Sequence, residues 1–462
     1  MTLQKLPVGI KGVDLGTVER DLGPDEPPPL PPNADLSAIG KPTPRLDGRL
    51  KVTGAARYTA DVRLPGMLHG KIVRSPHAHA RVKSIDTSRA EKHPGVRAVH
   101  VLDHLLGSAV LKDRAQEEPS KYPVVRYVGQ PICAIAAVTP HDAEEAAALV
   151  KVDYEVEPHV VDMDAERKPG APIVFPGPAE MAGTAGGGGG PSGVAQTGNV
   201  RGPVKTGPLG PPRGDVTKGF AEAEVTVEGT FRTQVQTHAP METHGVVADW
   251  KDDGVTVYSS TQGTGTVRDE IAALFDLPKG KVRVVTEFMG GGFGAKFGAG
   301  NYGLLATALS KKAGAPVRMM LDRREEHLAA GNRPSSEQHL RIGAKKDGTL
   351  TAIHLEAFGT AGVGTGAGSG GPAKNMYPCP NTLIEESDVF IHAGPAAAFR
   401  APGHPQGAFA LEQVIDDLAE KLAMDPLALR DKIDVDDDEG GKNVDSAARK
   451  VERKIGAEMA GW

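Results

Sequence analysis

The chain has 462 residues, a length that predicts two to four domains and excludes a single small module. It contains 58 glycines and 37 prolines, about 21% of the chain against a usual ~12%, which indicates a loop-rich α/β or α+β protein. The net charge of −6 argues against a nucleic-acid-binding surface and against a polybasic membrane patch.

The chain has two cysteines, Cys133 and Cys379, which lie far apart in the sequence. Their isolation excludes a disulfide framework and a thiolate set able to hold zinc or an iron–sulfur cluster. A redox reaction would therefore need a bound cofactor. The first residues, MTLQKLPVGIKGVD, lack the apolar core of a signal peptide, and no apolar run reaches the ~18 residues that span a bilayer. We therefore expect a cytoplasmic protein.

Residues 1–40 are predicted to be a proline-rich arm, because the run GPDEPPPLPP favours an extended polyproline conformation over a packed core. A first α/β domain is predicted over residues 41–165. Its strand-like segments are RYTADVRL, GKIVRS, VRAVHVL and QPICAIAAV. A helix is predicted to begin at Pro140 with Thr139 as its N-cap, and a further strand follows it.

Residues 166–214 are predicted to be a Gly/Pro-rich linker, since most of them have little apolar surface to bury in return for the entropy lost on ordering. A second α/β domain is predicted over 215–435, with strands in AEVTVEGTFRTQVQ and DGVTVYSSTQG. Two apolar helix faces are formed by Val267, Ile271, Leu274 and Phe275, and by Ala408, Leu411, Val414, Ile415, Leu418 and Leu422. Asp425 before Pro426 predicts the N-cap of a further helix. Residues 436–462 read as a polar segment without a core of its own.

A glycine-rich segment is the strongest local signal for a binding site. In KVRVVTEFMGGGFGAKFGAG, a predicted strand runs into Gly290, Gly291, Gly292 and Gly294 around Phe293. Glycines let backbone N–H groups approach an anionic ligand closely, so a phosphate or a pterin-like cofactor would fit. An ordinary turn is the alternative. The segment is not a P-loop, because no GK[ST] follows, and it lacks the dinucleotide-binding spacing.

Two further polar residues stand at points where a ligand could bind. Arg400, in AAAFRAPG, lies on a Pro/Gly-rich turn before a helix, where its guanidinium could hold an oxyanion or could bond loop carbonyls. Gln262 follows a strand in YSSTQG and could donate to a ligand oxygen or be a satisfied buried amide.

A metal site is a weaker possibility. His238, Glu242 and His244 in HAPMETHG share one strand parity and are zinc-ligand types, but Pro240 interrupts the strand between them. His77 and His79 in RSPHAHARV read as the surface of a strand.

The motifs STQG, MGGGFG and AFRAPG occur in this order, after GKPTPRLDGRLKVTGAARYTADVRLPGMLHGKIVRSPHAHARVKSID and YVGQPICAIAA. Together they resemble the molybdopterin-binding large subunit of the xanthine dehydrogenase/aldehyde oxidoreductase (molybdenum hydroxylase) family, from Gly40 to about Arg430. The resemblance implies an α/β (α+β) fold. A hammerhead-like α/β domain over 41–165 would be followed by the first half of the molybdenum-cofactor-binding domain over 215–435.

The resemblance also implies which residues bind the molybdenum-containing molybdopterin. Gln262 is similar to the glutamine that approaches the metal's apical oxygen, and Arg400 to the arginine of the FR turn. Gly291, Gly292, Phe293 and Gly294 resemble the loop whose backbone lies against the cofactor. No direct metal ligand is implied, and no catalytic residue, because the family's general-base glutamate lies in a GxGE-type loop that residues 1–462 do not contain.

We therefore expect a fragment, a truncated reading frame or one half of a split subunit, inactive as an isolated chain. The resemblance implies a complementary molybdopterin-subunit half that supplies the glutamate, an iron–sulfur subunit and a flavin (FAD) subunit, with the pterin in a dinucleotide form. The alternative is a non-catalytic remnant or assembly module that keeps the fold without the cofactor, and nucleotide binding by the glycine segment ranks third.

The resemblance also bears on the substrate. Purine-oxidising members have a glutamate and a phenylalanine at the positions of Phe297 and Pro402. We expect these two residues to line a substrate pocket for an aldehyde or an N-heteroaromatic compound, oxidised with water as the oxygen source. Without polar anchors a purine would leave hydrogen-bonding groups unpaired, so xanthine is disfavoured.

Overall fold

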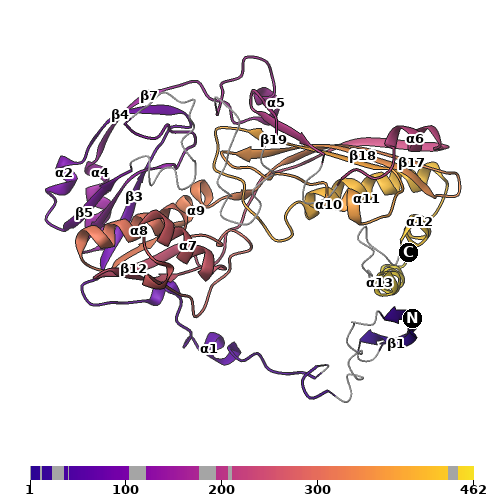
Figure 1. Cartoon of the computed structure of the whole chain (residues 1–462), viewed down its shortest axis with the longest axis horizontal. Coiled ribbons are helices and arrows are strands. Elements are labelled where there is room, and N and C mark those ends of the chain that lie inside the picture. The colour runs from indigo at the N-terminus through magenta and orange to yellow at the C-terminus, as the bar shows by residue number, and fades with distance from the viewer. Residues whose placement is uncertain are drawn as a thin grey trace.

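A computed structural model describes residues 2–10, 13–22, 36–39, 41–102, 121–175, 194–205, 211–434 and 446–462. Two mixed sheets with helices packed on them organise these residues, which confirms the predicted α/β class (Figure 1). The proline run GPDEPPPLPP lies outside the described residues. Within the described part of the chain, no helix is both long enough and apolar enough to cross a membrane.

The first sheet combines strands from both predicted domains, in the order β14-β13-β12-β15-β3-β6-β5. Its strands are β3 (Leu68–Arg74), β5 (Val96–Val101), β6 (Pro131–Ala137), β12 (Gly245–Lys251), β13 (Gly254–Ser259), β14 (Val282–Val285) and β15 (Val317–Met320). The parallel pair of β15 with β3 sets Val317 opposite Leu68 and Arg318 opposite His69. Because this pair joins residues from 41–165 to residues from 215–435, the sequence boundary between the domains is not a boundary of the sheet.

Helices cover both faces of this sheet, and β6 shows why. Every residue of QPICAIAA from Pro131 to Ala137 is buried. Ala134 and Ala136 join the apolar cluster under α8 (Gly300–Ala313), whereas Ile135 joins the cluster under α4 (Pro140–Leu149) and α2 (Ser88–Glu91). Alternate side chains of a strand point to opposite faces, so a strand that is apolar throughout needs a helix on each side.

The second sheet has the order β10-β17-β18-β19-β9-β8 and packs under α11 (His404–Lys421). Its strands are β8 (Gln196–Thr197), β9 (Val200–Val204), β10 (Val225–Thr233), β17 (Ser336–Ala344), β18 (Leu350–Gly362) and β19 (Thr382–Phe390). Leu411, Val414, Ile415 and Leu418 of α11 are fully buried, which confirms the predicted apolar face.

The predicted helix caps are confirmed. Thr139 accepts a hydrogen bond from the N–H of Asp142 (3.0 Å) at the start of α4. Asp425 accepts from Leu427 and Ala428, both at 2.9 Å, at the start of α12 (Pro426–Ile433). The helix expected from Val267, Ile271 and Leu274 is α7 (Thr264–Leu274).

The structure corrects two local expectations. RYTADVRL is not a strand, because the Asp61 carboxylate accepts the N–H of Tyr58 (2.9 Å) and closes the 3₁₀ turn η1 (Thr59–Asp61). Part of the predicted linker 166–214 is also ordered, as β8 and β9. Strand β9 pairs with β19 through its backbone and through a buried ion pair between Arg201 and Asp388 (3.0 Å), neither of which needs large apolar side chains.

The remaining elements form two-stranded sheets, connections and the first and last described segments. They are the hairpin of β1 (Thr2–Ile10) and β2 (Val13–Leu22), the pairs β4 (Ala80–Asp86) with β7 (Lys151–Val156) and β11 (Gln236–Thr237) with β16 (Asn332–Arg333), and the helices α1 (Gly48–Val52), α5 (Met163–Glu166), α6 (Val216–Ala221), α9 (Arg323–Ala329), α10 (Gly371–Asn375) and α13 (Ser446–Ala460), with η2 (Lys279–Lys281). Helix α13 forms within the segment predicted to be polar, and Arg453 ties it to Asp434 next to α12 (2.8 Å).

Candidate functional site

Three loops that are far apart in the sequence meet at one place. They are the segment after β13 that contains Gln262, the glycine segment 290–294 between β14 and α8, and the turn 398–403 before α11. The N–H of Gly294 donates to Oε1 of Gln262 (2.8 Å), and the N–H of Arg400 donates to the carbonyl of Phe293 (2.8 Å). The structure therefore brings Gln262, the glycine segment and Arg400 together.

The glycines are required by close packing in this segment. Gly294 has φ +109°, and a Cβ there would lie 2.4 Å from the carbonyl oxygen of Ala398, a backbone atom of the facing turn. Gly292 has no positive φ, but a Cβ there would lie 2.5 Å from Oε1 of Gln262. Phe293, between them, has φ +54°, a conformation that non-glycine residues rarely adopt. An ordinary turn would not need glycine for such close packing against two other loops.

The assembled loops contain donors that have no partner among the described residues. Within the described ranges, the N–H groups of Gly291, Gly292 and Phe293 have no hydrogen-bond acceptor. The side chains of Gln262 and Arg400 are exposed. Among the residues that the structure describes, the Gln262 amide nitrogen and the Arg400 guanidinium have no hydrogen-bond partner. Successive free N–H groups can bind an anionic or oxo ligand, and a guanidinium on the turn that contacts them could add a charged donor.

Comparison with known proteins identifies the family. The model of the aldehyde oxidase and xanthine dehydrogenase a/b hammerhead domain matches residues 53–158, and that of the molybdopterin cofactor-binding domain matches residues 204–433. The nicotinate dehydrogenase large molybdopterin subunit of Eubacterium barkeri is 30% identical over 412 residues, which cover 86% of this chain and 89% of that protein. The chain belongs to the xanthine dehydrogenase/aldehyde oxidoreductase family.

Other relatives of this molybdenum-enzyme family are longer. A probable xanthine dehydrogenase subunit of Bacillus subtilis is 34% identical, over 85% of this chain and 51% of its own length. Quinoline 2-oxidoreductase from Pseudomonas putida 86 superposes with a TM-score of 0.72 at 25% identity, over 90% of this chain and 55% of that one. Aldehyde oxidoreductase from Desulfovibrio gigas superposes with a TM-score of 0.69 at 29% identity, over 87% of this chain and 43% of that one. The chain thus spans about half the length of these relatives.

The free donors fit the cofactor that this family binds. Molybdopterin carries a phosphate, and its metal carries oxo ligands, which are acceptors without protons to donate. The N–H groups of Gly291, Gly292 and Phe293, the amide nitrogen of Gln262 and the guanidinium of Arg400 would hold such groups. A Cβ at Gly292 would displace Gln262, so the glycine keeps one of these donors in place.

Arg333 holds the turn 398–403, the FR turn that contains Phe399 and Arg400, in position from the side of β16. This buried side chain donates from Nη2 to the carbonyl of Arg400 (2.9 Å) and from Nη1 to Oε1 of Gln406 (3.0 Å), and it lies 4.6 Å from the centre of the Phe399 ring. Burial lowers the pKa of Arg333. Sequence patterns did not reveal this residue, because its partners lie 67 and 73 positions away and no local motif marks it.

Lys296 is the second bracing residue that sequence patterns did not reveal. It is fully buried beneath the glycine segment, and Nζ donates to the carbonyl of Glu242 (2.6 Å) and to Oγ of Ser260 (2.8 Å). Its own carbonyl accepts the N–H of Gln262 (2.7 Å). Burial lowers the pKa of Lys296 to about 8. Lys296 thus links the Gln262 segment to Glu242, whose carboxylate accepts the N–H of Gly290 (2.8 Å).

The histidines of HAPMETHG do not form a metal site with Glu242. His238 donates from Nε2 to the carbonyl of Ala398 (2.7 Å), and burial lowers its pKa. His244 contacts Oε1 of Glu326 through Nδ1 (2.7 Å) and the carbonyl of Ala295 through Nε2 (3.2 Å). Burial alone would raise the pKa of Glu326, but the hydrogen bond from His244 holds it below its ordinary value. Both histidines therefore brace the loops around the site.

The remaining predicted residues have these positions. Phe297 is half-buried directly after Lys296, and Pro402 is exposed in the FR turn. Outside the site, His79 contacts Glu157 through Nε2 (3.0 Å), and His77 packs edge-on against Tyr154.

Proposed function

We propose that the chain is the molybdopterin-binding part of a molybdenum hydroxylase that oxidises an aldehyde or an N-heteroaromatic compound with water as the oxygen source. The observation that carries the proposal is the surface of free donors formed by residues 291–293, Gln262 and Arg400. The bound molybdenum cofactor would supply the two-electron oxidation. The chain's own residues would bind its anionic groups and fix its orientation through a preorganised hydrogen-bonding surface.

The proposed substrate class depends on two residues, Phe297 after the glycine segment and Pro402 after Arg400. Phe297 and Pro402 offer no charged or amide group to a substrate, so a purine would leave several polar atoms unpaired. Relatives named for nicotinate, quinoline and aldehyde support a flat N-heteroaromatic compound or an aldehyde.

A complementary chain is proposed to supply the general base. Residues 1–462 contain no GxGE-type sequence, and a carbon hydroxylation with water needs a group that accepts a proton. The Eubacterium relative, which this chain covers to 89%, is itself named as one subunit of its enzyme, and so is the Bacillus relative. We infer that the active assembly also contains iron–sulfur and flavin subunits that remove the electrons.

The test is to co-express the chain with the products of neighbouring genes and to isolate the complex. We expect close to one molybdenum atom per chain by mass spectrometry, an oxidised pterin by fluorescence, and oxidation of aldehydes or N-heteroaromatics with a dye as electron acceptor. Product formed in ¹⁸O-labelled water should carry the label. A stable complex without molybdenum and pterin would instead support the non-catalytic assembly module.

A further inference from the structure

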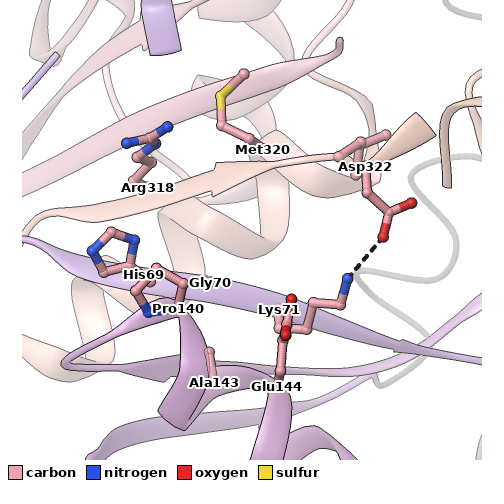
Figure 2. Close-up of a pocket in the computed structure, with 10 residues that line it drawn as sticks. His69, Gly70, Lys71, Pro140, Ala143, Glu144, Arg318, Met320 and Asp322 are labelled. Carbon is pink, nitrogen blue, oxygen red and sulfur yellow. Dashed lines mark hydrogen bonds and ion pairs between the residues drawn. The ribbon is translucent and has the colours of Figure 1, made fainter. Parts of the chain in front are cut away.

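A cavity of about 260 Å³ opens where the first sheet passes from β3 to β15, away from the loops described above (Figure 2). The parallel pairing of these strands sets Arg318 opposite His69. Beyond this pair, the cavity lies between Gly70 and Lys71 on one side and the segment from Met320 to Asp322 on the other, and the first turn of α4 completes its wall. The cavity therefore lies between the two parts of the sheet.

One end of the cavity carries unbalanced positive charge. Arg318 is half-buried, and within the described residues its guanidinium has no hydrogen bond or ion pair. Burial lowers the pKa of Arg318 and that of His69, and the charge of Arg63 lowers both further, which places Arg63 within electrostatic range of the pair. Arg63 itself donates only to backbone carbonyls among the described residues, those of Ala60 (2.8 Å) and Val62 (3.0 Å).

Several nearby carboxylates bear on this charge. Glu144 of α4 lines the cavity, but it lies beside Lys71 and away from Arg318 and His69 (Figure 2). Asp61 acts on Arg318 at a distance, and its carboxylate already accepts the N–H of Tyr58. At the opposite end of the cavity, Lys71 is paired with Asp322 (3.1 Å) and Glu325 (3.5 Å). Figure 2 shows the two ends, with the nitrogens of Arg318 and His69 at the left and the Lys71–Asp322 pair at the right.

We propose that this cavity binds a small oxyanion, a phosphate or carboxylate group, between Arg318 and His69. A guanidinium removed from water without a partner is unfavourable, and its planar fork matches two oxygens of such a group. The imidazole of His69 can donate a third hydrogen bond, and Arg63 adds attraction. Because Arg318 belongs to β15 and His69 to β3, the bound anion would join the two parts of the sheet.

The test is calorimetric titration of the full chain with inorganic phosphate and with acetate, at pH 7 and constant ionic strength set with chloride. We expect saturable binding at one site, and a higher melting temperature when the anion is present. Arg318→Gln should weaken binding at least tenfold, and Arg63→Gln severalfold. Arg341→Gln, on β17 beside Glu228, is the matched control and should bind as wild type does.

The two anions distinguish the chemistry of the ligand. Tighter binding of phosphate points to a phosphoryl group, and equal or tighter binding of acetate points to a carboxylate. The proposal is overturned if neither anion binds saturably, or if Arg318→Gln binds as tightly as wild type. If Arg318→Gln does not fold, Arg63→Gln decides the question, because Arg63 is exposed and unchanged binding in that variant would also overturn the proposal.

Discussion

Gly292 and Gly294, which are separated by one residue, should differ in how much stability an alanine substitution removes. At Gly292 the added Cβ meets the end of a flexible side chain, that of Gln262, at 2.5 Å. At Gly294 it meets the backbone carbonyl of Ala398 at 2.4 Å, and φ is +109°. Gly292→Ala can therefore be accommodated by rotation of Gln262, whereas Gly294→Ala forces the glycine segment away from the FR turn.

The magnitudes follow from the contacts that are lost. Gly294→Ala places a side chain at positive φ, which destabilises the folded state by about 1–2 kcal/mol. It also breaks the hydrogen bonds from Gly294 to Gln262 and from Arg400 to Phe293, each worth about 1 kcal/mol. A chain of 462 residues that unfolds as one unit has an entropy of unfolding of about 1 kcal/mol/K. The sum of about 3–4 kcal/mol therefore lowers the melting temperature by roughly 3–4 °C. Gly292→Ala loses about one hydrogen bond and regains ~0.4–1 kcal/mol from the stiffer unfolded chain, so its net effect stays below about 1 kcal/mol.

The assay measures stability and cofactor content in the same preparations. Thermal unfolding and molybdenum content per chain are compared for wild type, Gly292→Ala and Gly294→Ala in the isolated complex. Gly265→Ala, in α7 with nothing within 4 Å of the added Cβ, is the matched control. We expect Gly292→Ala to lose molybdenum severalfold at a nearly unchanged melting temperature. Unchanged molybdenum with a lowered melting temperature in Gly292→Ala would show that the segment is only a structural turn.

Three further outcomes are expected. Arg400→Lys in the complex should lower molybdenum content and activity severalfold, since lysine lacks the planar fork; equal content would make Arg400 a loop residue. The chain purified alone should oxidise neither aldehydes nor N-heteroaromatics, and turnover by it would refute the need for a complementary chain. Lys296 has a folded pKa of about 8 against 10.5 unfolded. The free energy of unfolding should therefore rise from pH 8 to 10.5, by up to ~1.4 kcal/mol per unit. Urea titrations should lose this slope in Lys296→Met but keep it in Lys346→Met.

Local patterns predicted the elements whose stabilising contacts are local. The apolar face of α11 and the caps Thr139 and Asp425 depend on residues within a few positions, and the structure confirms them. The segment 57–64 has the composition of a strand, but one side-chain hydrogen bond, from Tyr58 to Asp61, turns it into a 3₁₀ turn. Such a competition between backbone and side-chain hydrogen bonds is not visible in composition.

The grouping of the site could not be predicted from the residues alone. Gln262 and Gly294 are 32 positions apart, and each had an ordinary structural explanation by itself. The family resemblance supplied the grouping, and the structure shows its geometry. Arg333 and Lys296 act through partners brought close only by the fold, so no spacing in the sequence could have identified them.

The strand pairing that joins β15 to β3 determines how this protein can be divided. If the chain were cut after residue 165, the N–H of Leu68 at the edge of β3 would lose its acceptor, the carbonyl of Pro316 (2.8 Å). Leu68, Ile72, Ala134 and Ala136 would also lose the cover of α8 and become an open apolar strand surface, a template for aggregation. The two family models therefore delimit stretches of sequence, while cooperative unfolding should involve both at once. Amide exchange in β3 and β15 should report a single opening event.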